Sequence, residues 1–179
     1  MILSDRELRK AQANHNVVDP FRDEHVQPAS IDLRLGDQFI IWVGTEDWGR
    51  SGTMKQHKTT VVDGITIEPG QFMLGTTLET VTIPDDLSGK VEGRSSWGRL
   101  GLTVHITAGF IDPGFTGTIT LELKNDGHTP LWLPVGERIC QLVLTQLTSP
   151  ADRPYGSAGL GSQYQGQTGV TASAIGETP

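Results

Sequence analysis

The sequence predicts a mainly β domain of the sandwich or barrel class, and three observations support this prediction. Several short segments alternate apolar and polar residues, turn signals separate these segments at close spacing, and the chain carries 22 glycines and 10 prolines among 179 residues. Many short strands joined by Gly- and Pro-rich turns are typical of sandwiches and barrels rather than of βαβ sheets. At ~150 residues per domain the chain makes one domain, which we place at residues 1–150, with a tail at residues 151–179.

The only clear helix signal lies at the N-terminus. Ser4 is followed three residues later by Glu7, a pattern typical of a capping box, in which the two side chains bond to each other's backbone amides. We predict a helix from Asp5 to Ala13, because residues 14–16 (Asn-His-Asn) are unfavourable to its continuation.

After the helix the period of the apolar residues changes to two. Ile31, Leu33 and Leu35 alternate with Asp32 and Arg34, which predicts a half-buried strand. The further predicted strands are residues 38–43, 72–79, 89–92, 102–106, 118–123 and 139–147. Residues 44–64 are polar and irregular and are expected to form a surface excursion or hairpin.

Several isolated residues are expected to be structural. We assign to the hydrophobic core Trp42, Met54, Met73 and Trp132. Cys140 lies in an apolar segment and is expected to be a buried small hydrophobe rather than a nucleophile. His105 is interpreted as structural rather than catalytic.

Composition excludes several classes of function. Fourteen Lys and Arg against 21 Asp and Glu give a net charge of -7, which argues against a nucleic-acid partner. No apolar run approaches the ~20 residues of a membrane span, so no membrane partner is expected. A single cysteine cannot form an internal disulfide or supply a zinc-deaminase site, and the five histidines lack metal-ligand spacing. The chain is therefore expected to be cytoplasmic and free of zinc.

Residues 93–99 (Gly-Arg-Ser-Ser-Trp-Gly-Arg) are a candidate anion site. Arg94 and Arg99 offer two guanidinium groups that match phosphate oxygens, and Ser95 and Ser96 offer hydroxyls. The segment has P-loop glycine spacing but lacks the lysine and the magnesium-binding hydroxyl of that motif. A solvated basic turn is an equally good interpretation.

Two carboxylates are candidates for chemistry. Asp112, inside residues 108–115, can bind a sugar hydroxyl or orient water, although an Asp that initiates a turn is commoner. Glu122 shares a strand face with Thr118 and Thr120. A solvent-facing glutamate is the simpler interpretation, but in an enclosed pocket burial would raise the pKa of Glu122 and suit it to proton transfer.

The tail is rich in Gly, Ser and Gln from residue 148 onward. Such a composition buries little apolar surface, so a flexible tail is the simpler interpretation. The alternative is a tail that becomes ordered over a ligand, with Tyr155 and Tyr164 as its aromatic anchors.

Taken in order, these segments resemble the five motifs of the dUTPase and dCTP deaminase superfamily. The matching segments are residues 29–35, 93–96, 108–115, 136–142 and the glycine-rich tail. The opening residues 1–8, Thr120-Leu121-Glu122, and the segments 153–156 and 164–167 resemble the dCTP deaminase branch. Glu122 is the main discriminator, because ordinary dUTPases lack the corresponding glutamate.

The resemblance implies a dUTPase-like distorted jelly-roll barrel with a short N-terminal helix and a flexible tail that caps the nucleotide. It also implies a homotrimer with active sites between subunits. The substrate would be dCTP, with Mg²⁺ bound only through its phosphates, and dTTP is a possible inhibitor.

The resemblance further assigns roles to individual residues. Glu122 would be the catalytic acid and base, Asp112 would contact the deoxyribose, and the backbone of Thr120 and Leu121 would lie along the base. The triphosphate would be held by Arg94, Ser95, Ser96 and Arg99, and the substrate-binding set would be completed by Trp97, Gly98, Gln141, Tyr155 and Gln167. Gln163 is a weak candidate, because some deaminases carry a phosphate-binding lysine there.

Gly109 and Phe110 resemble the bifunctional deaminases that form dUMP, in contrast to branches with a His-Arg pair at this point. Gly109 would leave room for a water near the α-phosphate, or it would serve only the turn geometry. The sequence thus predicts a dCTP deaminase that produces dUMP, pyrophosphate and ammonia, supplying dUMP for thymidylate synthesis. The alternatives are a deaminase that stops at dUTP, a dUTPase, and a non-catalytic nucleotide sensor.

Overall fold

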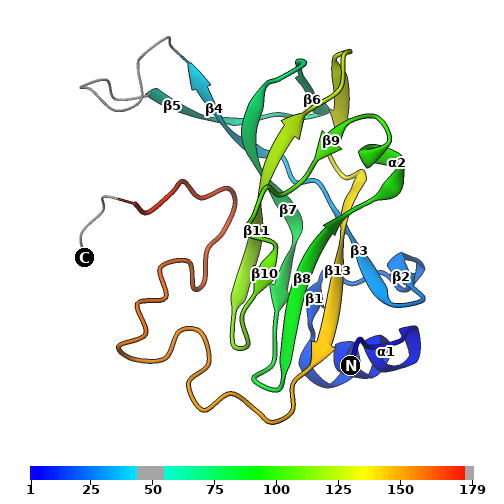
Figure 1. Ribbon diagram of the computed structural model, residues 1–179, viewed down its shortest axis with the longest axis vertical. Coiled ribbons are helices and arrows are strands. Elements are labelled where there is room, and N and C mark those ends of the chain that lie inside the picture. The colour runs from blue at the N-terminus through cyan, green and yellow to red at the C-terminus, as the bar shows by residue number, and fades with distance from the viewer. Residues whose placement is uncertain (44–54, 176–179) are drawn as a thin grey trace.

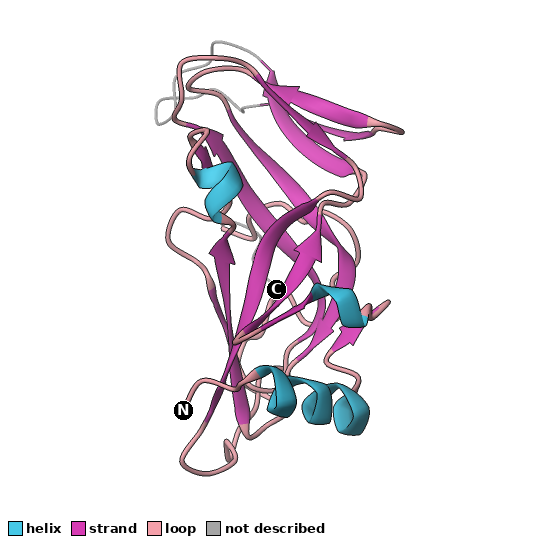
Figure 2. Ribbon diagram, turned by 90° about the vertical axis from the view of Figure 1, so that its right-hand side faces the viewer, coloured by secondary structure: helices cyan, strands magenta, loops and turns pink. Residues whose placement is uncertain are grey.

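The computed structural model describes residues 1–43 and 55–175, and its strands form two main antiparallel sheets. The first sheet has the order β5-β4-β7-β11-β9, with β1 also paired to β7, and the second has the order β10-β8-β13-β3-β2. Strands β12 and β6, which are far apart in the sequence, form a separate antiparallel two-stranded sheet. Figures 1 and 2 show the strands above helix α1.

The elements have the following bounds. The helical elements are α1 (Asp5–His15), the 3₁₀ turn η1 (Asp23–His25) and α2 (Ser95–Gly98). The strands are β1 (Val18–Asp19), β2 (Val26–Gln27), β3 (Ser30–Arg34), β4 (Gln38–Val43), β5 (Lys55–Thr60), β6 (Gly64–Ile67), β7 (Phe72–Thr82), β8 (Leu87–Gly93), β9 (Leu102–Thr103), β10 (Phe110–Ile111), β11 (Thr116–Asn125), β12 (Leu131–Pro134) and β13 (Arg138–Gln146).

The mainly β prediction is confirmed. The described strands remain separate sheets and do not close into a hydrogen-bonded barrel. The sequence predicted β4, the centres of the long strands and, at too great a length, β9. It did not predict β1, β2, β6, β10 and β12, which have two to four residues and are too short to show a period. Within the polar stretch 44–64, β5 pairs with β4 as the expected hairpin, whereas residues 44–54 lie outside the described residues.

One hydrophobic core fills the space between the two main sheets. Met73, Leu121 and Leu123 come from the first sheet and Leu33 and Leu142 from the second, and all five are fully buried. Cys140 is also fully buried, as expected, and burial raises the pKa of its thiol, which makes it a poor nucleophile.

The aromatic residues assigned to the core have different outcomes. Trp42 is half-buried and stacks on Phe72, with the ring centroids 5.0 Å apart. The assignment of Trp132 is wrong, because its side chain is 53% exposed on β12, where every second residue faces solvent. Met54 lies outside the described residues.

Helix α1 extends two residues beyond the prediction. It ends at Asn16, which adopts the left-handed conformation (φ 49°) and donates its backbone N–H to the carbonyl of Gln12. Asn tolerates this conformation, so it ends the helix without requiring a glycine. The predicted capping box is wrong: the Ser4 side chain makes no capping bond, and the Asp5 amide donates to the carbonyl of Pro28.

Strand β3 is buried along its whole length, which corrects the prediction of a half-buried strand. Arg34 points inward and pairs with Glu79 of β7: its Nε lies 2.6 Å from Glu79 Oε1, and its backbone N–H donates to Oε2 at 2.8 Å. Alternation failed to predict this burial because a paired charge can occupy a core position that an unpaired one cannot.

An irregularity in β7 turns Glu79 inward. Thr118 of β11 pairs with Thr80, and Thr120 pairs with Thr76, so residues 77–79 of β7 lie opposite the single residue Ile119. Glu79 is thereby 1% exposed, whereas Leu78 faces outward. The bulge therefore places the carboxylate of Glu79 beside the buried guanidinium of Arg34, where the two charges compensate each other.

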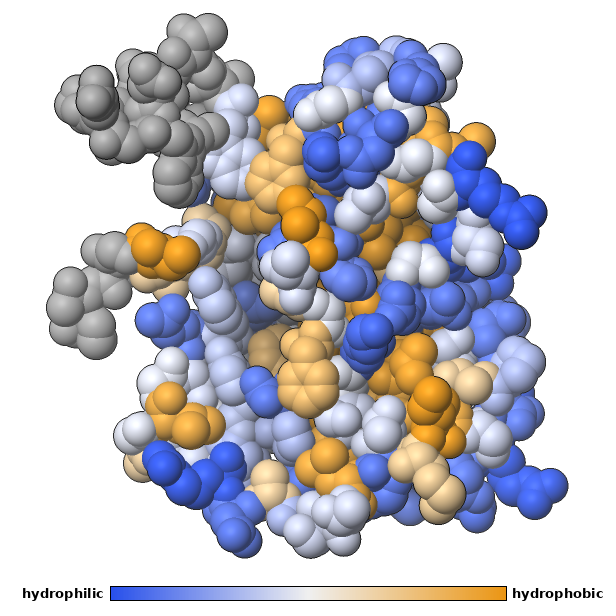
Figure 3. All heavy atoms as spheres, in the orientation of Figure 1, coloured by the Kyte–Doolittle hydropathy of each residue, from blue (hydrophilic) through white to orange (hydrophobic). Residues whose placement is uncertain are grey.

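None of the described helices is long and apolar enough to cross a membrane. On the face shown in Figure 3, hydrophilic and hydrophobic residues are interspersed.

We predict that Glu79→Ala lowers the free energy of unfolding by about 3–5 kcal/mol, because it leaves the buried guanidinium of Arg34 unpaired. Urea denaturation measures this change. Glu7→Ala is the matched control: its ion pair with Lys10 is exposed, and its loss is expected to cost less than about 1 kcal/mol. Equal effects of the two substitutions would show that Glu79 does not stabilise the fold by compensating the buried charge of Arg34.

Candidate functional site

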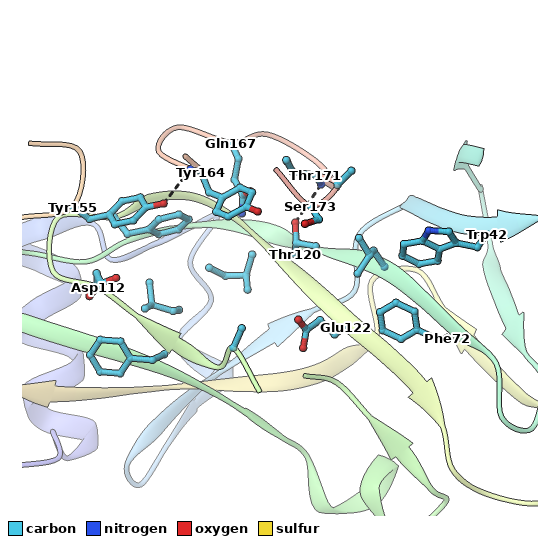
Figure 4. Close-up of a pocket in the computed structure, with 17 residues that line it drawn as sticks. Trp42, Phe72, Asp112, Thr120, Glu122, Tyr155, Tyr164, Gln167, Thr171 and Ser173 are labelled. Carbon is cyan, nitrogen blue, oxygen red and sulfur yellow. Dashed lines mark hydrogen bonds between the residues drawn. The ribbon is translucent and has the colours of Figure 1, made fainter. Parts of the chain in front are cut away.

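A pocket of about 510 Å³ lies between β11 and the tail. Figure 4 shows β11 on one side and the tail residues on the other. The pocket is lined by Trp42, Phe72, Leu74, Ala108, Phe110, Ile111, Asp112, Phe115, Ile119, Thr120, Glu122, Tyr155, Tyr164, Gln167, Thr171, Ala172 and Ser173.

Strand β11 supplies the polar side of the pocket. Burial alternates along this strand, so that Leu121 and Leu123 enter the core while Thr118, Thr120 and Glu122 are half-buried on the opposite face. The predicted shared face of these three residues is confirmed. Because that face is covered by the tail, Glu122 lies in a pocket rather than in open solvent.

Two backbone amides hold the carboxylate of Glu122. Oε2 accepts hydrogen bonds from the amides of Ile106 (2.6 Å) and Thr107 (3.4 Å). Oε1 accepts no hydrogen bond from the described residues. One oxygen therefore fixes the side chain, and the other is available to a water or a ligand.

The tail is attached to the body at a small apolar cluster. Val170 is 2% exposed and packs with Ile40 and Leu74, separately from the main core. Lys58 Nζ donates to the carbonyl of Val170 at 3.2 Å, and the Thr171 amide donates to Thr120 Oγ1 at 3.2 Å. These contacts place residues 166–173 across the face of β11 (Figure 1).

Two tyrosines and a glutamine of the tail complete this wall. The Tyr155 hydroxyl accepts a hydrogen bond from the Tyr164 amide at 3.0 Å, and Gln167 Nε2 donates to the carbonyl of Thr118 at 2.6 Å. Gln167 Oε1 is buried without a partner among the described residues. Buried acceptors without a partner are uncommon in folded proteins.

Asp112 lies at the same end of the pocket as Tyr155 (Figure 4). Its carbonyl accepts a hydrogen bond from the Phe115 amide, and Gly114 between them has a positive φ of 89°. Asp112 thus initiates a turn and also presents an exposed carboxylate to the pocket, so the two interpretations of this residue are compatible.

The candidate anion segment does not join this pocket. None of the residues from Arg94 to Arg99, all of which are described, lines it, and α2 lies on the other side of the molecule from the tail (Figure 1). Ser95, Ser96, Gly98 and Arg99 are exposed. The phosphate-binding candidates and the carboxylate candidates are therefore far apart within one chain.

A buried carboxylate anchors this segment. Asp32, 2% exposed, lies 3.4 Å from Arg94 Nε and 3.3 Å from Arg138 Nη1. Burial raises the pKa of Asp32, and the two guanidinium groups oppose that rise. Arg94 and Trp97 both donate to the carbonyl of Arg138 at 3.1 Å, so these two side chains are committed to the anchor.

Gln141 and Gln163 also lie outside the pocket lining. Gln141 accepts a hydrogen bond from Ser30 Oγ (2.8 Å) and donates to the carbonyl of Gly93 (3.2 Å), which places it beside the candidate anion segment. Gln163 is exposed on the tail.

Gly109 does not face empty space. A Cβ at this position would lie 2.9 Å from His105 Cε1 and 3.0 Å from the carbonyl oxygen of Val91. The imidazole of His105 therefore occupies the room that we expected a water to fill. Phe110, in contrast, is 62% exposed and lines the pocket.

Sequence reasoning missed the far end of the pocket. Trp42, Phe72 and residues 171–173 line it, and no motif distinguished them, because their proximity depends on the β4–β7 pairing and on the path of the tail. Within the described residues there is no group of three or more His, Cys, Asp or Glu side chains that could hold a metal.

Comparisons with known proteins identify the family of this chain. A family model described as dCTP deaminase-like matches residues 2–147. Proteins named "dCTP deaminase, dUMP-forming" from Mycobacterium sp. (strain KMS) and from Mycolicibacterium smegmatis are each 49% identical to this chain, over 97% of it and 95% of the relative. A crystal structure of 2'-deoxycytidine 5'-triphosphate deaminase from Agrobacterium tumefaciens shares the fold (TM-score 0.64, 24% identity), covering 80% of this chain and 47% of that one.

We predict that Val170→Asp releases the tail without unfolding the body. Burial of a valine stabilises by ~1.5 kcal/mol, so amide hydrogen exchange at residues 166–171 should accelerate by at least about tenfold. Ile175→Asp, at a position 94% exposed, should leave exchange unchanged. Unchanged exchange in the Val170 variant would show that the apolar cluster does not hold the tail.

Proposed function

Because this chain belongs to the dCTP deaminase-like family, we propose that it is a dUMP-forming dCTP deaminase. It hydrolyses dCTP to dUMP, pyrophosphate and ammonia. The observation that carries the proposal is Glu122, held on the pocket side of β11 with one carboxylate oxygen available. The identity of 49% to relatives named for this activity supports the same assignment.

Glu122 is the general base and then the general acid of the deamination. Its free Oε1 takes a proton from a water as that water attacks C4 of cytosine. The carboxyl gives this proton to N3, then takes the proton of the new C4 hydroxyl and gives it to the departing amine, while the C4–N bond breaks and the C4 carbonyl forms. The amides of Ile106 and Thr107 keep the side chain in position during both transfers.

The remaining pocket residues bind the nucleoside. The backbone of Thr120 and Leu121 lies along the base, and Asp112 contacts the deoxyribose. Tyr155 and Gln167 enclose the nucleoside from the tail, so that the tail caps the nucleotide and excludes bulk water. The unpaired Oε1 of Gln167 is an acceptor for a substrate donor.

The triphosphate is bound by a second copy of the chain. Among the described residues no Lys or Arg lines the pocket, yet a triphosphate requires cationic partners. The exposed Arg99, Ser95 and Ser96 supply them from the neighbouring subunit, with Mg²⁺ accompanying the phosphates as part of the substrate. A homotrimer with sites between subunits satisfies this requirement, and dTTP, which carries the same triphosphate, is a possible inhibitor.

The second hydrolysis distinguishes this enzyme from a deaminase that releases dUTP. Gly109 and Phe110 are the determinants of that step. Because Gly109 has no side chain, the imidazole of His105 can pack directly against its backbone. We propose that this packing is how Gly109 contributes to the second hydrolysis. A larger residue would displace His105 and change the shape of the pocket wall that carries Phe110.

We predict that Glu122→Gln lowers ammonia release from dCTP by about 10²–10⁴-fold and leaves dCTP binding largely intact. Gln keeps the volume of the side chain but cannot accept the proton of water. Ammonia assay and calorimetry measure the two effects, and Glu68→Gln, at an exposed position, is the control. Substantial deamination by the Glu122 variant would refute its role.

Chromatography of a dCTP reaction is expected to show dUMP and pyrophosphate without accumulation of dUTP. In the double variant Gly109→His, Phe110→Arg, ammonia release should persist while pyrophosphate release falls. Accumulation of dUTP by the unmodified enzyme would favour the monofunctional alternative. Release of pyrophosphate from dUTP without ammonia from dCTP would instead favour a dUTPase.

Mixing two inactive variants tests the shared site. Glu122→Gln and Arg99→Ala alter different halves of the site, so mixed trimers should regain roughly a quarter of the sites in an intact form. The measurement is ammonia release after the two variants are unfolded and refolded together. Persistent inactivity of correctly assembled mixtures would place both residues in the same subunit's site.

A further inference from the structure

One end of the pocket has no role in the proposed reaction. Beyond Glu122, the described lining residues are Trp42, Phe72, Leu74 and Ala172, whereas the polar Thr171 and Ser173 of the tail lie beside Thr120 (Figure 4). The rings of Trp42 and Phe72 stack with an interplanar angle of 27°, and Leu74 is 8% exposed. This apolar end is distinct in chemistry from the opposite end, where Asp112 and Tyr155 lie.

Figure 4 gives the order of these groups along the pocket. Asp112 and Tyr155 lie at one end, Glu122 and Thr120 lie in the middle, and Trp42 and Phe72 lie at the other end. The backbone pairing explains this order, because Glu122 of β11 is opposite Leu74 of β7 and Lys124 is opposite Phe72. Leu74 is in turn opposite Ile40 of β4, two residues before Trp42.

The reaction fixes how a cytosine ring can lie in this space. Its C4 must be at Glu122, and its N1, on the far side of the ring from C4, carries the sugar toward Asp112. The positions next to C4 are N3 and C5, and only these can face beyond Glu122. N3 needs a hydrogen-bonding partner, which the polar side of β11 offers and the apolar side chains Phe72 and Leu74 do not.

We therefore propose that the apolar end receives a small apolar substituent on C5, so that 5-methyl-dCTP is a substrate of this enzyme. This inference rests on the proposed deaminase function. An added methyl group in a hydrophobic pocket is worth about 10–200-fold in binding or specificity. The specificity for the C5 substituent would thus be determined by contacts with Trp42, Phe72 and Leu74.

The reaction of this substrate consumes two waters. The oxygen of the first water forms a bond to C4 as the C4–N bond breaks. One proton of that water goes to N3, and the other goes to the amino group, which leaves as ammonia. The oxygen of the second water forms a bond to the α-phosphorus as the bond to the bridging oxygen breaks. The products are dTMP, pyrophosphate and ammonia.

The test is a competition between dCTP and 5-methyl-dCTP in one reaction, with dUMP and dTMP resolved by chromatography. The ratio of the two products gives the ratio of kcat/KM. We expect kcat/KM for 5-methyl-dCTP to be about tenfold above that for dCTP. In Phe72→Ala this advantage should disappear, because the wall beside the methyl group is removed.

Two further variants keep the result interpretable. Trp42→Ala should reduce the same ratio if Phe72→Ala fails to fold. Trp132→Ala, at an exposed tryptophan outside the pocket, should leave the ratio within about twofold of the parent value. The ratio refers each variant to its own dCTP activity, so a general loss of folded protein does not change it.

The outcomes separate this inference from the function on which it rests. Absence of ammonia from dCTP itself would overturn the proposed function. Turnover of dCTP with exclusion of 5-methyl-dCTP would overturn the inference alone. Equal loss of both substrates in Phe72→Ala would also overturn it, because the aromatic wall would then support the pocket without reading C5.

Discussion

A buried carboxylate with two cationic partners organises the candidate anion segment. Asp32 sits in the middle of β3, contacts Arg94 and Arg138, and is removed from solvent. An isolated charge in this position would be strongly destabilising, so the strand, the segment before α2 and the start of β13 must come together for the chain to fold. The ion pairs of Asp32 therefore also fix the position of the exposed residues Ser95, Ser96 and Arg99. Two residues further along β3, Arg34 imposes the same constraint on Glu79 and thereby on the bulge of β7.

The tail side of the pocket is held by several kinds of contact. Val170 packs with Ile40 and Leu74 apart from the main core, whereas Tyr155 and Tyr164 pack against the main core. The tail also forms hydrogen bonds with Thr116, Thr118 and Thr120 of β11. In the proposed shared site, the cationic groups lie on the sheet body of one subunit, and the tail of another covers the nucleoside pocket.

The sequence predicted those parts of the molecule that depend on local pattern. The alternation in residues 118–123 placed Glu122 and Thr120 on one face, and the structure confirms it. The same rule failed for Asp32 and Arg34, because burial of these charges depends on partners about 45 or more residues away along the chain. Trp42 and Phe72 illustrate a second limit. Trp42 was assigned to the core and Phe72 only began a predicted strand, and the strand order alone brings them beside Glu122. The core assignment of Trp132 was wrong because β12 pairs only with β6, and one face of this two-stranded sheet is open to solvent.

The position of Val170 near the end of the chain has a consequence for synthesis. Chains emerge from the ribosome N-terminal end first, and domains generally fold as units. All strands of the two main sheets have been translated once β13 is complete. We therefore expect the sheets to fold while the tail that covers the pocket is still being translated. Glu122 is thus in place on β11 before the tail covers it. We expect a chain that ends at residue 150 to leave this face of β11 open to solvent.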